Sequence, residues 1–127
     1  MFQNLEIFQL SHAMARHAAQ RQEAVASNMA NADTPGYAAR DLTPFAELVR
    51  YRTDQTGMHA TRTRHIGGDL SLAAQDQRTH TGTSPNGNNI SLEEEMMRAV
   101  SVRKQHDRAL MIYKSSMNIL RTSIGRR

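Results

Sequence analysis

Apolar residues recur at intervals of four and three along the C-terminal part of the chain, the spacing of one face of an α-helix. The pattern holds for almost five heptads, and a strict seven-residue repeat is typical of a left-handed coiled coil. We therefore predict a long helix within residues 91–127. Its seam, in which eight of ten positions are apolar, comprises Leu92, Met96, Ala99, Arg103, His106, Leu110, Tyr113, Met117, Leu120 and Ile124.

The N-terminal part, residues 3–32, carries a second seam and contains no Gly or Pro. Eight alanines between Ala13 and Ala32 favour helix by propensity alone. Because most seam positions are small, another helix could approach closely. We expect a mainly α fold in which the two terminal helices form an antiparallel coiled-coil hairpin. The seam positions of the first helix are Leu5, Phe8, His12, Ala15, Ala19, Gln22, Ala26 and Met29.

Turn-forming residues predict where the first helix ends and a short one begins. Asn31 can take a left-handed conformation at the helix C-terminus. Residues 34–37, with the sequence Thr-Pro-Gly-Tyr, fit a type II turn that places glycine at the position needing positive φ. A short helix is expected over residues 44–51, with Thr43 as its N-cap and Pro44 as its first residue.

The boundaries of the last helix are also marked. Ser91 and Glu94 match a capping box, in which the serine hydroxyl accepts an amide hydrogen bond and the glutamate reaches back. The run Glu93–Glu95 complements the positive end of the helix dipole. Gly125 ends the helix.

The middle of the chain, residues 52–90, has no hydrophobic period and holds five of the seven glycines. We expect an extended, irregular segment there, with a short β-hairpin around residues 66–70 as one option. The chain is thus divided into an N-terminal helix (1–33), a turn, short helix and middle segment (34–90), and a C-terminal helix (91–127).

Composition adds that this helical chain is short of core. Leu, Ile, Val and Phe together make up 22 of 127 residues, or 17%, which is below the ~20% expected for a self-sufficient core. The formal net charge is only +4, so the charge half of the disorder signature is missing. Such a chain buries its apolar stripes against copies of itself or against a partner.

Charged residues along the terminal helices would then form ion pairs between subunits, each worth little. The residues expected to do so are Arg16, Arg21, Arg98, Arg103 and Arg108, together with Glu23 and Asp107.

Candidate chemistry is sparse. The six histidines have no zinc-ligand spacing, cysteine is absent, and the acidic run is explained by helix capping. We therefore expect no catalytic residue, no cofactor, no metal and no small-molecule substrate. The basic pair Arg62 and Arg64 is too isolated, and aromatic residues are too few, to indicate a nucleic-acid surface. No secretory signal and no membrane span is visible in the sequence.

One segment is distinctive. Residues 26–37, Ala-Ser-Asn-Met-Ala-Asn-Ala-Asp-Thr-Pro-Gly-Tyr, closely resemble the N-terminal signature of bacterial flagellar axial proteins, in which a helix ends in Asn-x-x-Asn before Thr-Pro-Gly-Tyr. Residues 38–41 and 45–48 are similar to its continuation in the small proximal rod proteins, and residues 85–96 to the stretch before their last helix. The chain therefore resembles the flagellar basal-body rod protein family. The motif residues are Asn28, Asn31, Thr34, Pro35, Gly36 and Tyr37.

This resemblance implies a non-catalytic subunit that is exported by the flagellar type III apparatus without a cleaved signal and resides in the periplasmic rod of the basal body. It implies terminal helices that are poorly ordered in the monomer and form a coiled-coil layer on assembly. Residues 28–37 would be a structural joint that sets the angle between the first helix and the middle segment. The partners would be other copies, other rod proteins, and components of the membrane ring and export gate.

The leading hypothesis is thus a structural subunit of the proximal flagellar rod. The alternative, from another class, is a small basic coiled-coil protein that binds nucleic acid or a regulatory partner. A rod subunit should be largely monomeric and partly unfolded when purified, whereas a regulator should be a stable dimer in dilute solution.

Overall fold

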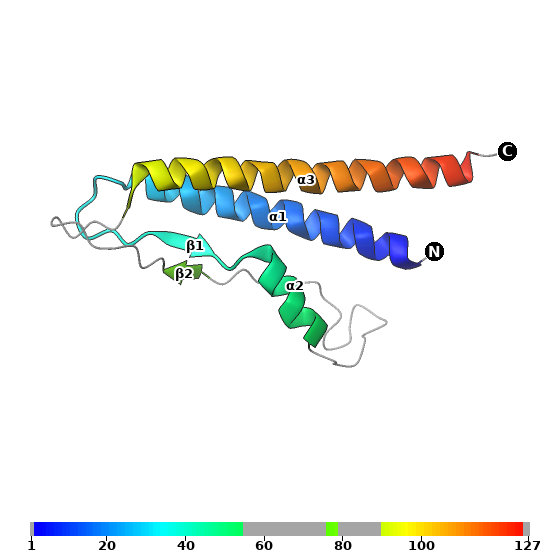
Figure 1. Cartoon of the computed structure of the whole chain (residues 1–127), viewed down its shortest axis with the longest axis horizontal. Helices are drawn as coiled ribbons and strands as arrows, with labels where there is room; N and C mark the ends of the chain where they lie inside the picture. The colour runs from blue at the N-terminus through cyan, green and yellow to red at the C-terminus, as the bar shows by residue number, and fades with distance from the viewer. Residues whose placement is uncertain (1, 55–75, 79–89, 126–127) are drawn as a thin grey trace.

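The computed structural model describes residues 2–54, 76–78 and 90–125 of the chain. The elements are α1 (Phe2–Ala30), β1 (Arg40–Leu42), α2 (Phe45–Asp54), β2 (Asp76–Arg78) and α3 (Leu92–Ile124). Helices α1 and α3 lie side by side and run in opposite directions, so that the start of α1 and the end of α3 lie at the same end of a long hairpin (Figure 1). This confirms the predicted mainly α fold built on two long terminal helices.

Small residues fill the centre of the hairpin. Ala18 and Val25 of α1, and Val102 and Ala109 of α3, are each only 1% exposed. Such short side chains let the two helices approach closely, because the distance between helix axes is set by the side chains at the contact. Buried residues of α3 recur every seven positions, as coiled-coil packing requires.

The face of α3 that packs against α1 is not the face that the seam predicts. The buried row follows Glu95, Val102 and Ala109, whereas the seam residues on an adjacent row are half exposed or more (50–79%). These exposed seam residues are Leu92, Met96, Leu110 and Ile124.

Other seam positions flank the buried row. Ala99, His106, Met117 and Leu120 are half-buried, and Tyr113 meets Phe8 edge-to-face, with ring centroids 5.4 Å apart. In α1 the seam residues Ala19 and Ala26 are likewise exposed next to buried neighbours. Within one chain the helices therefore pack beside the two seams, and a role for the seams in contacts between chains stays a prediction.

The turn after α1 is confirmed. The Tyr37 amide donates a hydrogen bond to the Thr34 carbonyl (3.2 Å), and Gly36 has φ of 76°, as a type II turn requires. The left-handed conformation expected for Asn31 is wrong, because no non-glycine residue in the described part of the chain has positive φ. The carbonyl of Pro44 accepts the first amide bonds of α2, so that helix begins one residue later than expected.

The start of α3 corrects a second expectation. Ser91 occupies the N-cap in an extended conformation, but its side chain makes no capping hydrogen bond. Glu94 instead lies 3.8 Å from Arg98, one turn further along the helix. The predicted end is confirmed, since the Gly125 amide caps the helix by donating to the Arg121 carbonyl at 2.8 Å.

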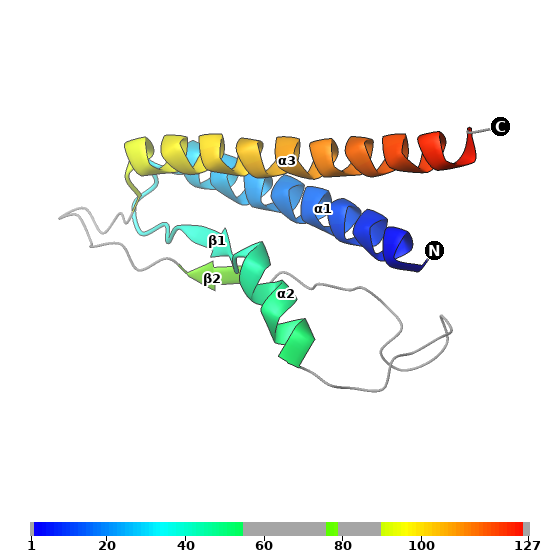
Figure 2. The same ribbon diagram turned by 45° about the vertical axis from the view of Figure 1, so that its right-hand side comes forward.

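Strand β1 pairs with β2 in an antiparallel two-stranded sheet, with Arg40 opposite Arg78 and Leu42 opposite Asp76. This pairing was not predicted, and the hairpin considered around residues 66–70 lies outside the described residues. From β1 the chain passes into α2, which extends away from the helical hairpin in both views (Figures 1 and 2). None of the described helices combines the length and apolar character needed to cross a bilayer.

Candidate assembly site

Asn28, in the last turn of α1, is the centre of a buried hydrogen-bond cluster. Its side chain is fully buried, with 0% exposure. Its amide nitrogen donates to the Arg40 carbonyl (2.7 Å) and to Glu95 Oε2 (3.2 Å), and its amide oxygen accepts from the Arg40 backbone amide (3.1 Å). One asparagine therefore joins the end of α1, the start of β1 and the first turn of α3.

Glu95 completes this polar cluster from the side of α3. Although it lies in a run of three glutamates, it is only 2% exposed. Its other oxygen accepts from Arg98 at 2.8 Å, so the buried carboxylate has both a neutral and a cationic donor. A buried charge is tolerated only when it is paired and hydrogen-bonded in this way.

A second contact ties β1 to α1 further along the helix. Arg21 donates two hydrogen bonds to the carboxylate of Asp41, from Nε to Oδ1 (2.7 Å) and from Nη2 to Oδ2 (2.6 Å). Desolvation raises the pKa of Asp41, but the hydrogen bonds and the charge of Arg21 outweigh it, and the pKa lies below the ordinary value of 3.8. Both side chains are 14% exposed, so the pair is largely shielded from water.

His17 makes the third contact, where the chain enters α2. Its Nε2 lies 2.9 Å from the Thr43 carbonyl, which can only accept, so Nε2 carries the proton. Nδ1 is buried and has no partner among the described residues, while the ring packs on Phe45 with centroids 5.5 Å apart. Burial lowers the pKa of His17 below 6.5, despite the opposing hydrogen bond to Thr43.

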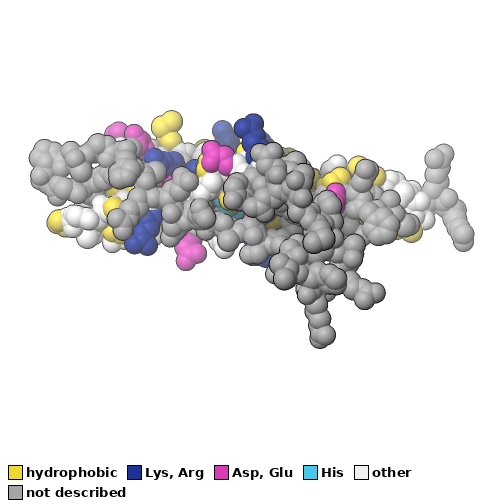
Figure 3. All heavy atoms as spheres, turned by 90° about the horizontal axis from the view of Figure 1, so that it is seen from below, with side chains coloured by type: hydrophobic (Ala, Val, Ile, Leu, Met, Phe, Trp, Pro, Cys, Tyr) yellow, Lys and Arg dark blue, Asp and Glu magenta, His cyan; other side chains and the backbone are white. Residues whose placement is uncertain are grey.

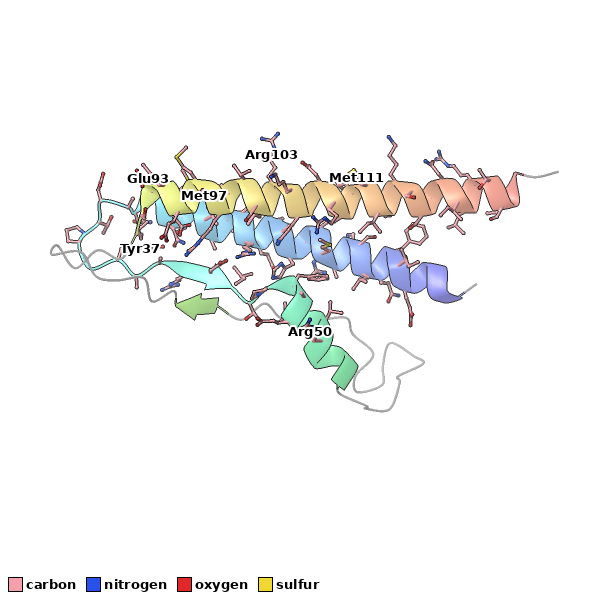
Figure 4. All side chains as sticks on the ribbon, viewed as in Figure 1. Tyr37, Arg50, Glu93, Met97, Arg103 and Met111 are labelled. Carbon is pink, nitrogen blue, oxygen red and sulfur yellow. The ribbon has the colours of Figure 1, made fainter. Side chains whose placement is uncertain are left out.

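The remaining motif residues lie around the turn. Asn31 donates to the Ser27 carbonyl (2.8 Å) and accepts from the Thr34 hydroxyl (3.4 Å). The Tyr37 hydroxyl, at the loop end of the hairpin in Figure 4, lies 3.2 Å from that of Ser27 and 3.5 Å from Asn28 Oδ1.

Pro35 and Gly36 are exposed at the tip of the turn. The structure thus gathers the Asn28–Tyr37 motif into one local unit, and its role as a joint in assembly stays a prediction.

Sequence reasoning missed the partners of this unit. Arg21 and Arg98 were expected to pair between subunits. Within the chain, Arg21 instead forms an ion pair with Asp41, and Arg98 pairs with Glu94 and Glu95. The spacing of His17, Arg21 and Asn28, which lie along one helix face, was the available signal.

The outer surface of α3 is the second component of the site. Large apolar side chains are exposed there, and Met97 and Met111, labelled in Figure 4, are 75% and 65% exposed. Beside it, an open groove of about 660 Å³ runs between the helices. Its lining includes Ala18, Ala19 and Gln22 from α1 and Ala99, Arg103 and His106 from α3.

Five of the nine residues that line the groove belong to the two predicted seams, and they are Ala19, Gln22, Ala99, Arg103 and His106. In this part of the hairpin the seams therefore lie beside one groove, whereas the seam residues Phe8 and Tyr113 contact each other directly. Among the described residues there is no group of three or more His, Asp or Glu that could hold a metal ion.

Comparison with known proteins agrees with this geometry. A family described as "Flagella basal body rod protein" matches residues 12–37, which include most of α1 and the turn. The chain is 30% identical to flagellar basal body rod protein FlgB of Agrobacterium fabrum, with 98% of this chain and 96% of the relative covered. It is 32% identical to FlgB of Escherichia coli (82% and 85% covered) and 36% identical to FlgB of Salmonella typhimurium (80% and 83% covered).

Proposed function

We propose how assembly works in this chain, which belongs to the flagellar basal body rod protein family and is a structural subunit of the proximal rod. The subunit polymerises through its terminal helices, and the exposed side chains of α3 are covered by neighbouring subunits. In this way it links the membrane ring and export gate to the rest of the rod.

The observation that carries this proposal is the amount of apolar surface that the hairpin leaves in water. Of the apolar residues of α3 described, only Val102 and Ala109 are buried, and eight large ones are at least half exposed. So many large apolar side chains left in water along one helix favour contact with other chains. The eight are Leu92, Met96, Met97, Val100, Leu110, Met111, Ile119 and Ile124.

The joint has a matching role in this proposal. Asn28 and His17 bond the backbone of Arg40 and Thr43, and Arg21 bonds the side chain of Asp41. Residues 40–43 are thereby held along α1, and α2 then projects outward. The hairpin would form the inner coiled-coil layer of the rod. Strand β1 and helix α2 would then lie outside this layer in a fixed orientation.

A hairpin that buries so little apolar surface is expected to be weakly stable alone, since burial supplies most of the free energy of folding. We therefore expect the purified monomer to be partly unfolded and to gain helix when it assembles. The same property suits passage through the narrow export channel, which the family implies occurs without cleavage of a signal.

Two experiments test the proposal. Basal bodies isolated from cells that carry an affinity-tagged copy should contain this chain together with rod and ring proteins, and its absence from them would contradict the proposal. Circular dichroism and sedimentation of the purified chain should give a monomer with less helix than the structure contains.

A stable, fully helical dimer in dilute solution would favour the alternative, a small basic coiled-coil regulator. The relatives do not support that alternative, since all those named above are rod proteins.

A further inference from the structure

His17 lies where the chain passes from β1 into α2, and it is only 3% exposed. Its ring donates to the Thr43 carbonyl and packs on Phe45, the first residue of α2. Figure 3, seen from the side of β1 and α2, shows only a small patch of histidine surface among the coloured side chains. In the described part of the chain, α2 has only sparse contact with α1 and α3. The orientation of α2 on the hairpin therefore depends largely on this ring.

The surroundings of His17 suit a neutral ring. Its Nδ1 is buried without a partner among the described residues, so a proton there would create a buried donor with no acceptor. The charged groups that act on the ring within the described ranges are Arg21 of its own helix, which opposes protonation, and Asp41 of β1, which favours it; α2 and α3 contribute none. Burial outweighs the favourable contacts and lowers the pKa of His17.

The two neighbouring contacts of this segment keep their charge when His17 titrates. Asn28, which bonds the backbone of Arg40, has no ionisable group. In the ion pair of Arg21 with Asp41, the pKa of the arginine is raised and that of the aspartate is lowered, so both stay charged at mildly acidic pH. His17 is thus the titrating contact of the three, and it is also the one that adjoins α2.

We propose that protonation of His17 releases α2 from the helical hairpin, with the backbone around Thr43 as the pivot, while Asn28 and Arg21 keep β1 in place. In the released state the ring is hydrated and regains its ordinary proton affinity. Each pH unit below 6.5 should therefore favour release by up to tenfold, until the lower pKa of the attached state is reached. This switch is a property of the single chain and does not rest on the proposed function.

Distances between spin labels test the release, because the chain has no cysteine and labelled cysteines can be introduced in pairs. Ser115→Cys on α3 is the common anchor, Arg50→Cys reports α2 (Figure 4) and Arg40→Cys reports β1; all three residues are exposed. The purified full-length chain is kept folded with sucrose, which strengthens burial of apolar surface, and is frozen at a series of pH values from 8 to 5. Double electron–electron resonance then gives the distance distribution of each pair.

The pair that includes Arg50→Cys should give a narrow distribution above pH 7 and a second, broad component below pH 6.5. The ratio of broad to narrow component should rise by up to tenfold for each pH unit. The pair that includes Arg40→Cys should stay narrow throughout. An Arg50→Cys distribution that is unchanged at pH 5 would overturn the proposal, and so would simultaneous broadening of both pairs, because the whole hairpin would then be opening.

Two histidine variants locate the titrating group. His17→Gln keeps a side-chain N–H for the Thr43 carbonyl but cannot ionise, so it should leave α2 attached at pH 5. His12→Gln removes an exposed histidine of the same helix and should release α2 as the unsubstituted chain does. Release that persists in His17→Gln, or that is lost in His12→Gln, would contradict the assignment.

A measurement on the unsubstituted ring decides the matter if His17→Gln does not fold. The NMR signal of the His17 ring C2 proton follows its ionisation, and its midpoint should coincide with that of the release and lie below pH 6.5. Different midpoints for ionisation and release would overturn the proposal. Because every step uses the purified chain, such a result would leave the proposed function intact.

Discussion

Replacement of Asn28 by alanine should be the most damaging single change in the joint. Its side chain is completely buried and makes three hydrogen bonds to Arg40 and Glu95. Two of these are bonds to backbone groups, worth about 1 kcal/mol each, and the third goes to a carboxylate, worth about 1.5–3 kcal/mol. Part of the Arg40 backbone can be rehydrated, so we expect a net loss of about 3 kcal/mol.

Asn31 supplies a matched control, since it is the other asparagine of the same Asn-x-x-Asn pattern. Within the described residues its side-chain amide bonds to Ser27 and Thr34, and these contacts are exposed to water. Asn31→Ala should therefore cost about 0.5 kcal/mol. From the sequence alone the two asparagines are equivalent, and the structure ranks them.

The assay is chosen to suit the small core of the hairpin. Far-ultraviolet circular dichroism at 222 nm reports the helix of the purified chain, and titration with trimethylamine N-oxide drives folding of a weakly stable monomer. Asn28→Ala should move the folding midpoint to clearly higher osmolyte concentration, while Asn31→Ala should leave it nearly unchanged. Equal shifts for the two variants, or an unshifted midpoint for Asn28→Ala, would refute the reasoning.

A second substitution at the same position tests the electrostatics. Asn28→Asp keeps the shape but places a carboxylate against the buried Glu95. It should be at least as destabilising as alanine at neutral pH. Because the folded state would favour the protonated aspartic acid, stability relative to the unsubstituted chain should recover as the pH falls.

Three further predictions concern the turn and the two other contacts of the joint. Gly36→Ala should lower the free energy of unfolding by about 1–2 kcal/mol. The cause is the positive φ of this residue, because a Cβ there would meet no atom within 4 Å. Gly36→Val should also impair swimming, and normal rods and swimming in both variants would refute this. Burial lowers the pKa of His17, so its contribution to stability should be fully present above pH 6.5 and be lost as the pH falls through the lower pKa of the folded chain, and His17→Gln should flatten this dependence in pH-dependent melts whereas exposed His12→Gln should not. Asp41→Asn should lower the free energy of unfolding by about 1–2 kcal/mol because it leaves Arg21 partly buried without its carboxylate, and a double replacement of Arg21 and Asp41 by alanine that loses as much stability as the two single alanine replacements added together would argue against the pair.

The turn that ends the first helix could be predicted from the sequence because it depends on single residues. The Thr34–Tyr37 turn requires only the fixed φ of Pro35 and the freedom of Gly36, and both are intrinsic to those residues. By contrast, the predicted capping box was only half right. Ser91 does occupy the N-cap position, but its hydroxyl makes no hydrogen bond to a helix amide. Strand β1 was missed, since three residues are too few to show a period.

The rotation of α3 was the main feature that the pattern of residues could not decide. Apolar residues occupy adjacent rows of this helix, as Met96 beside Met97 and Leu110 beside Met111 show, so a period of seven does not select one row. The packed row was selected by small side chains and by the contact of Asn28 with Glu95. Among three consecutive glutamates nothing in the sequence distinguishes the one that is buried.

The sequence by itself determined two long helices, the turn that ends the first of them, a shortage of core, and membership of a family. These properties depend on local propensity, on periodicity and on motif residues, all of which are read along the chain. Only the tertiary structure decided which faces meet and which polar groups are used inside the chain, and which apolar faces remain exposed for a partner. Those choices depend on contacts between residues far apart in sequence, such as Asn28 and Glu95, whose energies exist only once the helices lie side by side.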